Sequence, residues 1–199
     1  MTAQPSQRPV RPPFGEPRLP PGQRLTEGWP VLTYGGTPRV DLATWEFKIF
    51  GRVEQEITLN WQQFMALPQT TDVSDIHCVT TWSRYDNEWE GVRFRDVLAL
   101  AKVSLEVTDV MFHCYGGYTT NVPLAELMGD EVLFAHTHNG KPIDSDHGGP
   151  LRGIVPKLYF WKSAKWVRGI ELLSDERPGF WEMYGYHIHG DPWIEERYS

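Results

Sequence analysis

Short runs of alternating hydrophobic and polar residues recur along this chain, and such alternation is typical of β-strands with one buried face. The clearest run covers residues 45–53, and a second follows at residues 56–59. Similar runs predict further strands at residues 75–80, 110–115, 118–122, 132–135, 151–155 and 166–173. Residues 89–92, Trp-Glu-Gly-Val, predict a turn that leads into another strand.

Helical signals are confined to short segments. Asn60 is suited to cap a helix over residues 61–66, which Pro68 would end. Residues 94–101 predict a second, amphipathic helix, and residues 123–128 a third that opens on a proline. Many short strands with few, short helices indicate a strand-rich, mixed α+β domain rather than a doubly wound parallel sheet.

Proline divides the chain into two parts. Residues 1–30 hold eight of the 16 prolines, so we expect residues 1–29 to form an extended, partly docked arm before a single domain over residues 30–199. Because no long apolar run and no signal-peptide core is present, we expect no membrane span and a cytoplasmic location. Two cysteines are too few for a disulfide framework, and we expect both as free thiols.

Charge is distributed unevenly along the chain. The formal net charge is −7, of which residues 1–29 contribute about +2, so the rest of the chain carries −9. Residues 147–170 reverse that sign, with no carboxylate and with five cations: Arg152, Lys157, Lys162, Lys165 and Arg168. Such a run is compatible with a solvated basic edge, but its four aromatic residues favour a partly buried cationic pocket. With glycines nearby, that pocket would suit a phosphate-bearing ligand, whereas the net acidity argues against nucleic acid as the partner.

Two kinds of residue could carry chemistry outside this run. Cys78 falls where a predicted strand passes into a polar loop, a place where reactive groups are displayed, although a free cysteine is more often a buried core thiol. Cys114 has a similar setting and favours the core more strongly. The pairs His136/His138 and His187/His189 could each chelate a metal from one strand face, but neither has an evident third ligand.

Five motifs occur in an order that resembles one known family. They are HCVTTWS, WEGVRFRDVL, NGKPI, DHGGPLRGIVP and KSAKWV. Together they resemble the sulfite oxidase family of molybdenum–molybdopterin oxidoreductases, and most of all its small bacterial members without haem. The resemblance extends from about residue 29 to the C-terminus, and it implies the sulfite oxidase-type molybdopterin-binding fold.

The resemblance also implies a cofactor and the residues that hold it. In the family, molybdenum is held by the dithiolene sulfurs of molybdopterin and by one protein cysteinate, the position at which Cys78 stands; a soft thiolate suits such a sulfur-rich centre. The residues that match the family's contacts to phosphate and pterin are His147, Arg152, Ser163, Ala164 and Lys165. Cys114 would lie near the pterin, and Tyr34 belongs to a loop that would close over the cofactor.

Some family features are changed or missing in this chain. The sulfite oxidases have a tyrosine near the metal where this chain has His136, and they have a pair of arginines after the ligand cysteine where this chain has only Arg84. We expect both residues to act in catalysis beside Cys78. The implied reaction is two-electron oxygen-atom transfer on a small substrate, either sulfite-like oxidation or reduction of a sulfoxide or N-oxide.

Two domains found in larger members of the family affect which electron carrier we expect. Neither a dimerisation domain nor a cytochrome domain is recognisable, so we expect no haem and a separate electron carrier, and the sequence does not predict an oligomeric state. Two alternatives stay open: a non-catalytic protein that binds molybdopterin or another phosphorylated ligand, and a redox pair formed by Cys78 and Cys114.

Overall fold

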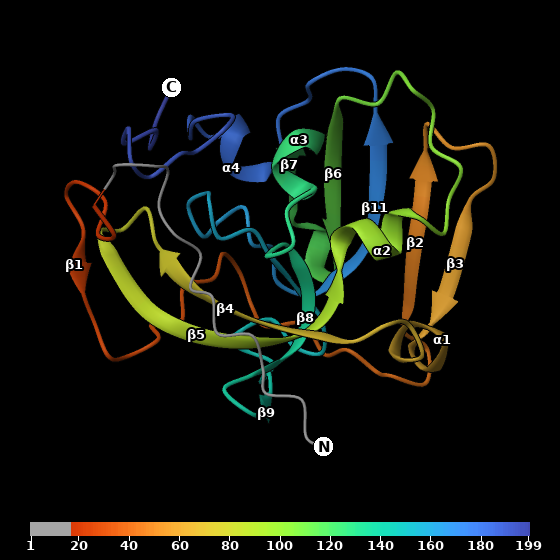
Figure 1. Ribbon diagram of the computed structural model, residues 1–199, viewed down its shortest axis with the longest axis horizontal. Coiled ribbons are helices and arrows are strands. Elements are labelled where there is room, and N and C mark those ends of the chain that lie inside the picture. The colour runs from red at the N-terminus through yellow and green to blue at the C-terminus, as the bar shows by residue number, and fades with distance from the viewer. Residues whose placement is uncertain (1–16) are drawn as a thin grey trace.

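Two β-sheets contain most of the regular structure of this protein (Figure 1). The structure, a computed structural model, describes residues 17–199. The larger sheet has the path β1-β5-β8-β10, with β4 paired to β5 and β9 to β8. Its strands are β1 Arg24–Leu25, β4 Thr70–His77, β5 Trp82–Arg93, β8 Leu133–His138, β9 Lys141–Pro142 and β10 Arg152–Ile154.

The second sheet has the order β3-β2-β11-β6-β7. Its strands are β2 Glu46–Gly51, β3 Ile57–Asn60, β6 Asp109–Cys114, β7 Thr119–Pro123 and β11 Val167–Leu173. The late strand β11 lies in the middle of this sheet, parallel to β2 and antiparallel to β6. Long-range pairing therefore ties the two halves of the chain into one domain, and the strand-rich α+β prediction is confirmed.

The helices are short and sit at strand ends. They are α1 Trp61–Met65, α2 Phe94–Leu98, the 3-10 turn η1 Tyr115–Gly117, α3 Leu124–Leu127 and α4 Phe180–Met183. Asn60 forms a capping box with Gln63, each side chain bonding the other's backbone N–H at 2.9 Å, so the predicted start of the first helix is confirmed. Within residues 17–199, no helix is both long and apolar enough to cross a membrane.

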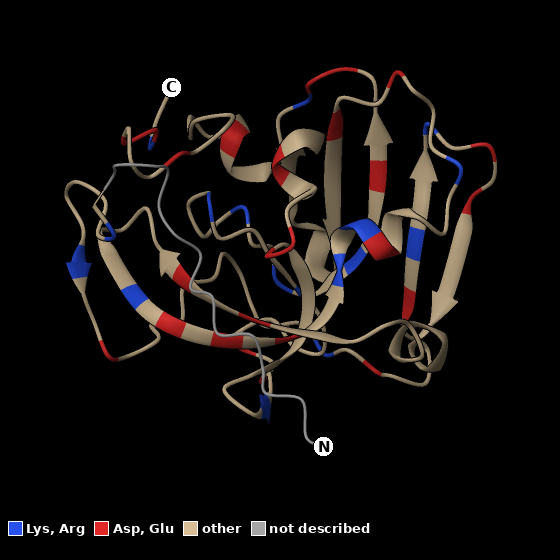
Figure 2. Ribbon diagram, viewed as in Figure 1, with Lys and Arg blue, Asp and Glu red and all other residues tan. Residues whose placement is uncertain are grey.

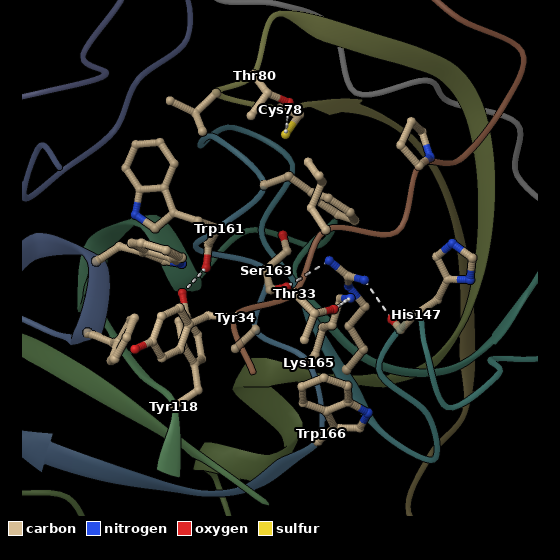
Figure 3. Close-up of a pocket in the computed structure, with 18 of the residues that line it drawn as sticks. Thr33, Tyr34, Cys78, Thr80, Tyr118, His147, Trp161, Ser163, Lys165 and Trp166 are labelled. Carbon is tan, nitrogen blue, oxygen red and sulfur yellow. Dashed lines mark hydrogen bonds between the residues drawn. The ribbon is translucent and has the colours of Figure 1, made fainter. Parts of the chain in front are cut away.

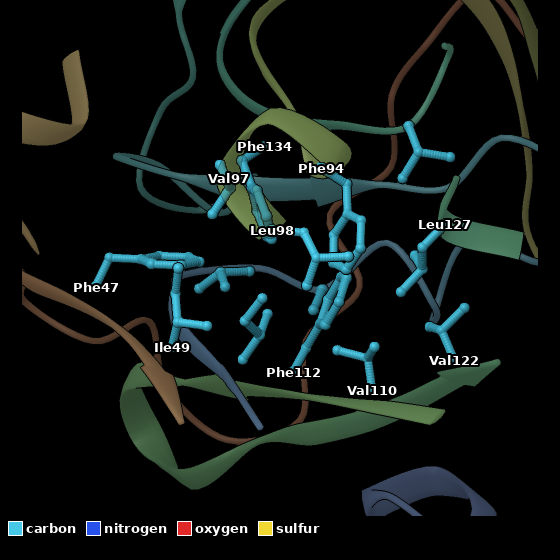
Figure 4. Close-up of a cluster of buried hydrophobic side chains, with 14 of the residues drawn as sticks. Phe47, Ile49, Phe94, Val97, Leu98, Val110, Phe112, Val122, Leu127 and Phe134 are labelled. Atoms are coloured by element: carbon cyan, nitrogen blue, oxygen red, sulfur yellow. The ribbon is translucent and has the colours of Figure 1, made fainter. Parts of the chain in front are cut away.

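The main core is packed with aromatic side chains (Figure 4). Phe134 of β8 meets Phe47 of β2 at a centroid distance of 5.0 Å and Phe112 of β6 at 5.6 Å, which joins the two sheets. Aromatic pairs of this kind contribute about 0.5–1.5 kcal/mol beyond the area they bury. A smaller buried cluster surrounds Cys78, on the other side of the larger sheet's strand β8.

The predicted turn at residues 89–92 is wrong, because these residues lie inside the long strand β5. Glycine is needed there for close backbone approach: a Cβ on Gly91 would lie 2.1 Å from the carbonyl oxygen of Phe134. The pairing of β5 with β8 shifts register at this point. Gly91 therefore marks a β-bulge rather than a chain reversal.

Residues 17–29 of the expected arm pack against the domain, while residues 1–16 lie outside the described residues. Strand β1 pairs parallel with the start of β5. Arg18 forms an ion pair with the nearly buried Asp75 at 2.8 Å, and the indole of Trp193 donates to the carbonyl of Pro17 at 2.8 Å. The amino-terminal segment is thus bound to strand β4 and to the C-terminal segment.

Acidic and basic side chains lie on different elements, as the separate basic run at residues 147–170 predicts (Figure 2). Exposed carboxylates recur along β5 at Asp86, Glu88 and Glu90. The cations of the basic run instead lie on β10, on the loop after it and at the start of β11.

Candidate functional site

One cavity of about 400 Å³ opens between the two sheets; we call it the central cavity (Figure 3). Such a volume lies in the range of pockets for small ligands and cofactors. Its wall is built by residues 29–34, the turn at Cys78, the η1 turn, His147, strand β10 with the loop after it, and helix α4. Aromatic side chains dominate the lining, among them Trp29, Trp82, Tyr118, Phe160, Trp161, Trp166, Phe180, Trp181 and Tyr186.

Cys78 contributes a sulfur to this lining. Strand β4 ends at His77, and the chain reverses through residues 78–81, which we call the Cys78 turn: Thr81 N–H donates to the Cys78 carbonyl at 3.0 Å. The Sγ atom lies 3.2 Å from the Thr80 hydroxyl. Burial raises the pKa of the Cys78 thiol, so the free thiol is the stable form until a cation or metal approaches.

Arg152 is a buried cation without a carboxylate partner among the described residues. Its two terminal nitrogens donate to the carbonyls of His147 at 2.6 Å and Ser163 at 3.0 Å, while Nε has no partner. The guanidinium lies over the Phe160 ring at 3.9 Å. Burial lowers the pKa of Arg152 to about 9, because desolvation disfavours the charged guanidinium. An uncompensated charge in a cavity wall favours an anionic ligand.

Lys165 adds a second cation to the same wall. Its ammonium donates to the Thr33 hydroxyl at 2.7 Å and to the Asp146 carbonyl at 2.6 Å. Burial, with Arg152 nearby, lowers the pKa of Lys165 to about 8. The backbone N–H groups of Ala164 and Lys165 donate to no other group in residues 17–199. Free backbone donors beside two cations form the kind of concavity in which phosphates bind.

His147 and Tyr34 border the cavity from two further sides. Both ring nitrogens of His147 face acceptors, Asp144 Oδ2 at 2.8 Å and the Trp29 carbonyl at 3.0 Å, and its ring stacks on Trp29 at 4.0 Å. Tyr34 is 66% exposed and packs on Phe180 of α4 at 4.8 Å. Its side chain therefore covers part of the cavity's entrance.

The structure brings together Tyr34, Cys78, His147, Arg152, Ser163, Ala164 and Lys165. Figure 3 shows Cys78 and Lys165 on opposite sides of the cavity, with Ser163 between them. Residues that belong to three separate sequence motifs thus line a single cavity.

Three other predicted site residues do not line the central cavity. Cys114 is buried in the main core, where desolvation raises its thiol pKa. His136 bonds to Gln69 Oε1 at 3.0 Å and to the Thr137 hydroxyl at 2.8 Å. Arg84 bonds to Asn87, to the Glu27 carbonyl and to His138 Nε2. None of the three side chains lines the central cavity, and their proposed roles stay predictions.

The other cations of the basic run are engaged elsewhere. Lys157 pairs with Glu131 at 3.2 Å, and Arg168 lies over the Tyr115 ring at 4.9 Å. Lys162 is fully buried with Glu182, at 2.6 Å. Of the five cations, only Arg152 and Lys165 line the cavity.

Several lining residues were missed by the sequence analysis. Trp29 was assigned to the arm, yet it stacks on His147. Tyr118 is half-buried and donates to the Trp161 carbonyl at 2.8 Å. Gly116 and Gly117 have positive φ, and a Cβ there would meet open space, so they leave room on the cavity side. Only the double glycine is a signal that sequence reasoning could have used.

The histidine pairs do not form a metal site. Within residues 17–199, no group of three or more His, Cys, Asp or Glu side chains is placed to hold a metal ion. His189 instead bonds to Glu196 at 2.8 Å and to Glu126 at 3.2 Å.

Comparison with known proteins gives one consistent result. Residues 34–181 match the family model described as the oxidoreductase molybdopterin binding domain. The chain is 45% identical to the uncharacterized oxidoreductase YuiH of Bacillus subtilis over 183 residues, 92% of each chain. It is 25% identical to the putative protein-methionine-sulfoxide reductase subunit YedZ1 of Azospira oryzae over 173 residues, 85% of this chain and 66% of that one.

More distant similarities cover less of the other protein. Mitochondrial sulfite oxidase of Rattus norvegicus is 34% identical over 109 residues, which is 49% of this chain and only 20% of that enzyme. The crystal structure of the sulfane dehydrogenase SoxCD from Paracoccus pantotrophus superposes with a TM-score of 0.64 at 21% identity, covering 70% of this chain and 41% of that one. The SoxCD similarity supports the fold.

Proposed function

The chain belongs to the oxidoreductase molybdopterin-binding domain family and is an oxidoreductase of the sulfite oxidase-like type, and on that premise we propose that it transfers an oxygen atom to or from a small, uncharged substrate. Reduction of a sulfoxide or an N-oxide is the reaction we favour. When bound, the molybdenum cofactor would supply the two-electron chemistry, and the residues of the central cavity would hold and orient it.

The observation that carries the proposal is the buried guanidinium of Arg152, whose charge has no carboxylate partner in the described chain. Burying an unpaired charge is costly, and a phosphate ester would offset that cost. Lys165 and the unused backbone N–H groups of Ala164 and Lys165 add donors suited to the same group. Molybdopterin ends in a phosphate, so these residues fit its terminal group.

The other requirement of the cofactor is a soft ligand for the metal. Cys78 offers the one thiol on the cavity lining, and a thiolate suits a sulfur-rich molybdenum centre. Metal coordination would also favour the deprotonated sulfur, which burial alone disfavours. We therefore assign the ligand to Cys78, the phosphate contacts to Arg152 and Lys165, and a pterin contact to His147.

The preference for an uncharged substrate follows from which cations reach the cavity. A doubly charged oxyanion loses water on entry, and only cations in the wall offset that cost. Arg152 and Lys165 are assigned to the cofactor, while Arg84 and His136 are not on the lining. What is left of the wall is mainly aromatic, which suits a sulfoxide or N-oxide.

Metal content of the purified protein tests the cofactor assignment. We expect molybdenum and a fluorescent oxidised pterin in the extract, in equal amounts. The change Cys78→Ser should keep the fold but abolish turnover and the sulfur-to-molybdenum absorption, since it removes only the ligand sulfur. Cys114→Ser is the matched control and should have a much milder effect. Normal turnover in Cys78→Ser would refute the ligand assignment.

Turnover with an artificial electron donor or acceptor tests the substrate class. We expect faster reduction of uncharged sulfoxides than oxidation of sulfite at neutral pH, because the wall has no cation left for sulfite. A separate electron carrier would replace the artificial one in the cell. Fast sulfite turnover at pH 8 that His136→Ala leaves unchanged would contradict this argument.

A further inference from the structure

The Cys78 turn is held from behind by both ends of the described chain. We propose that Gln23, in the amino-terminal segment, and Arg197, in the C-terminal segment, are positioning residues that fix the direction of the Cys78 side chain. This inference rests on the proposed function, in which the Cys78 sulfur binds the metal.

The turn contains a strained residue that its surroundings must hold in place. Thr81 has φ of 75°, in the left-handed region that a β-branched residue seldom occupies. Strained residues of this kind persist where neighbouring structure over-determines them, and they cluster at functional sites. Here the backbone N–H of Arg24 donates to the Thr81 carbonyl at 2.9 Å, and the N–H of Thr26 donates to the Ser83 carbonyl at 2.9 Å.

Gln23 bridges the two sides of the turn with its amide group. Its Nε2 donates to the Cys78 carbonyl at 3.1 Å, and its Oε1 accepts a bond from the Ser83 hydroxyl at 3.2 Å. The Cys78 carbonyl also accepts the Thr81 N–H, so both of its acceptor positions are filled. The backbone of the cysteine is thereby fixed from the side away from the cavity.

Arg197 holds the next peptide. Its Nη1 donates to the Val79 carbonyl, and its side chain is only 14% exposed. The guanidinium lies 5.0 Å from the Tyr159 ring. The two chain segments are also packed against each other: a Cβ on Gly22 would lie 2.8 Å from the Glu195 carboxylate.

These contacts matter for the sulfur because they fix the backbone that carries it, together with the bond from the Cys78 N–H to the Trp82 carbonyl at 2.8 Å. On the cavity side, the Cys78 sulfur has the Thr80 hydroxyl as its one hydrogen-bond partner in the described chain. The direction of the Cα–Cβ bond, and with it the position of the sulfur, is therefore set by the backbone that Gln23 and Arg197 hold. Groups that orient a metal ligand from outside are commonly needed for full metal affinity.

The first arm of the test uses cofactor-free protein. Hydrogen exchange of the backbone at residues 78–83 is measured in Gln23→Met and Arg197→Met, which keep side-chain length but lose the donors. We expect roughly two- to tenfold faster exchange in the turn, the effect of losing one hydrogen bond, with unchanged exchange in strands β6 and β11. Gln62→Met and Arg52→Met, both exposed and outside the turn, are matched controls. Unchanged exchange in the turn would overturn the inference.

The second arm uses the loaded protein and a readout that general stability does not move. We expect a shifted sulfur-to-molybdenum absorption and faster loss of molybdenum in both Met variants, with partial rescue in Arg197→Lys, which retains a donor. A loosened turn with an unshifted absorption would also overturn the positioning role. If the unsubstituted protein has no absorption that depends on Cys78, the proposed function fails instead, so the two failures are distinguishable.

Discussion

At the scale of single residues, the buried charge of Arg152 indicates the kind of ligand that the cavity binds. It is 2% exposed, and among the described residues its charge faces two carbonyl oxygens and the rings of Phe160 and Trp29, with no carboxylate. Those contacts solvate a guanidinium but do not neutralise it. The arginine therefore has the surroundings of a residue that binds an anion, in contrast to Arg168, which lies over Tyr115 away from the cavity.

We expect Arg152→Met to lower cofactor affinity by about ten- to a hundredfold, because it removes charge-assisted hydrogen bonds of roughly 1.5–3 kcal/mol while preserving packing. The measurement is pterin occupancy at a series of cofactor concentrations, with circular dichroism to verify the fold. Arg168→Met is the control and should bind normally. The assignment would be reversed if Arg168→Met emptied the site and Arg152→Met did not.

The candidate residues that come from contiguous motifs line the central cavity, whereas the isolated candidates Arg84 and His136 do not. His147, Arg152 and Lys165 stand in glycine-rich or basic segments with a recognisable pattern. His136 does not line the central cavity, because strand neighbours point to opposite faces, and its catalytic role stays a prediction. It shares the face of Phe134, which packs in the main core, whereas Ala135 belongs to the cluster around Cys78. None of residues 134–136 lines the central cavity, so only a residue's contacts in the fold decide whether it reaches the site.

At the scale of elements, helix α4 depends on one buried ion pair. Glu182 Oε1 lies 2.6 Å from Lys162 Nζ and also accepts from the Trp161 indole at 2.9 Å. Lys162 donates further to the carbonyls of Asn121 at 2.8 Å and Ile188 at 2.6 Å. This network links α4 to strand β7 and to the loop after β10. Since α4 and that loop both line the cavity, the pair maintains the cavity's shape.

We expect Glu182→Ala to lower the free energy of unfolding by about 3–5 kcal/mol, because it leaves the Lys162 charge buried and unpaired. The double change Glu182→Leu with Lys162→Met should recover most of that loss. Chemical denaturation of the cofactor-free proteins measures both, with the exposed Glu106→Ala as a control. A cost below about 1 kcal/mol for Glu182→Ala would mean that the pair is dispensable.

The elements that sequence predicted well are those with local causes. The capping box at Asn60 defines its helix within four residues. Gly91 had no such local cause: glycine ordinarily indicates a turn, and only the approach of the β8 backbone explains its place inside β5. Likewise β1 depends on pairing with β5, more than 50 residues later, so a proline-rich segment gave no sign of it.

At the scale of the whole molecule, His77 is buried near the place where residues 17–26 and the C-terminal segment pack together. Its Nδ1 lies 2.9 Å from the Ser83 hydroxyl, and its ring packs edge-on against Trp193 at 5.0 Å. Burial lowers the pKa of His77 to about 4, from an ordinary value of 6.5. Between these two pH values the unfolded chain binds a proton that the folded protein does not.

Stability should therefore fall as the pH drops from 6.5 to 4. His77 contributes a slope of at most about 1.4 kcal/mol per pH unit in that window and none above it. Denaturation curves at several pH values measure the slope, and His77→Gln should reduce it by that amount. An identical pH dependence in His77→Gln would show that the acid sensitivity originates elsewhere.

The unpaired charge of Arg152 also has a consequence for the protein's lifetime in the cell. If the cofactor phosphate binds Arg152 as proposed, it would offset the electrostatic cost of the folded state, and binding would draw molecules away from the unfolding equilibrium. Proteases act on opened chains, and loaded molecules open less often. Under molybdate starvation the enzyme would thus be lost as protein as well as activity, and its abundance would follow the supply of metal.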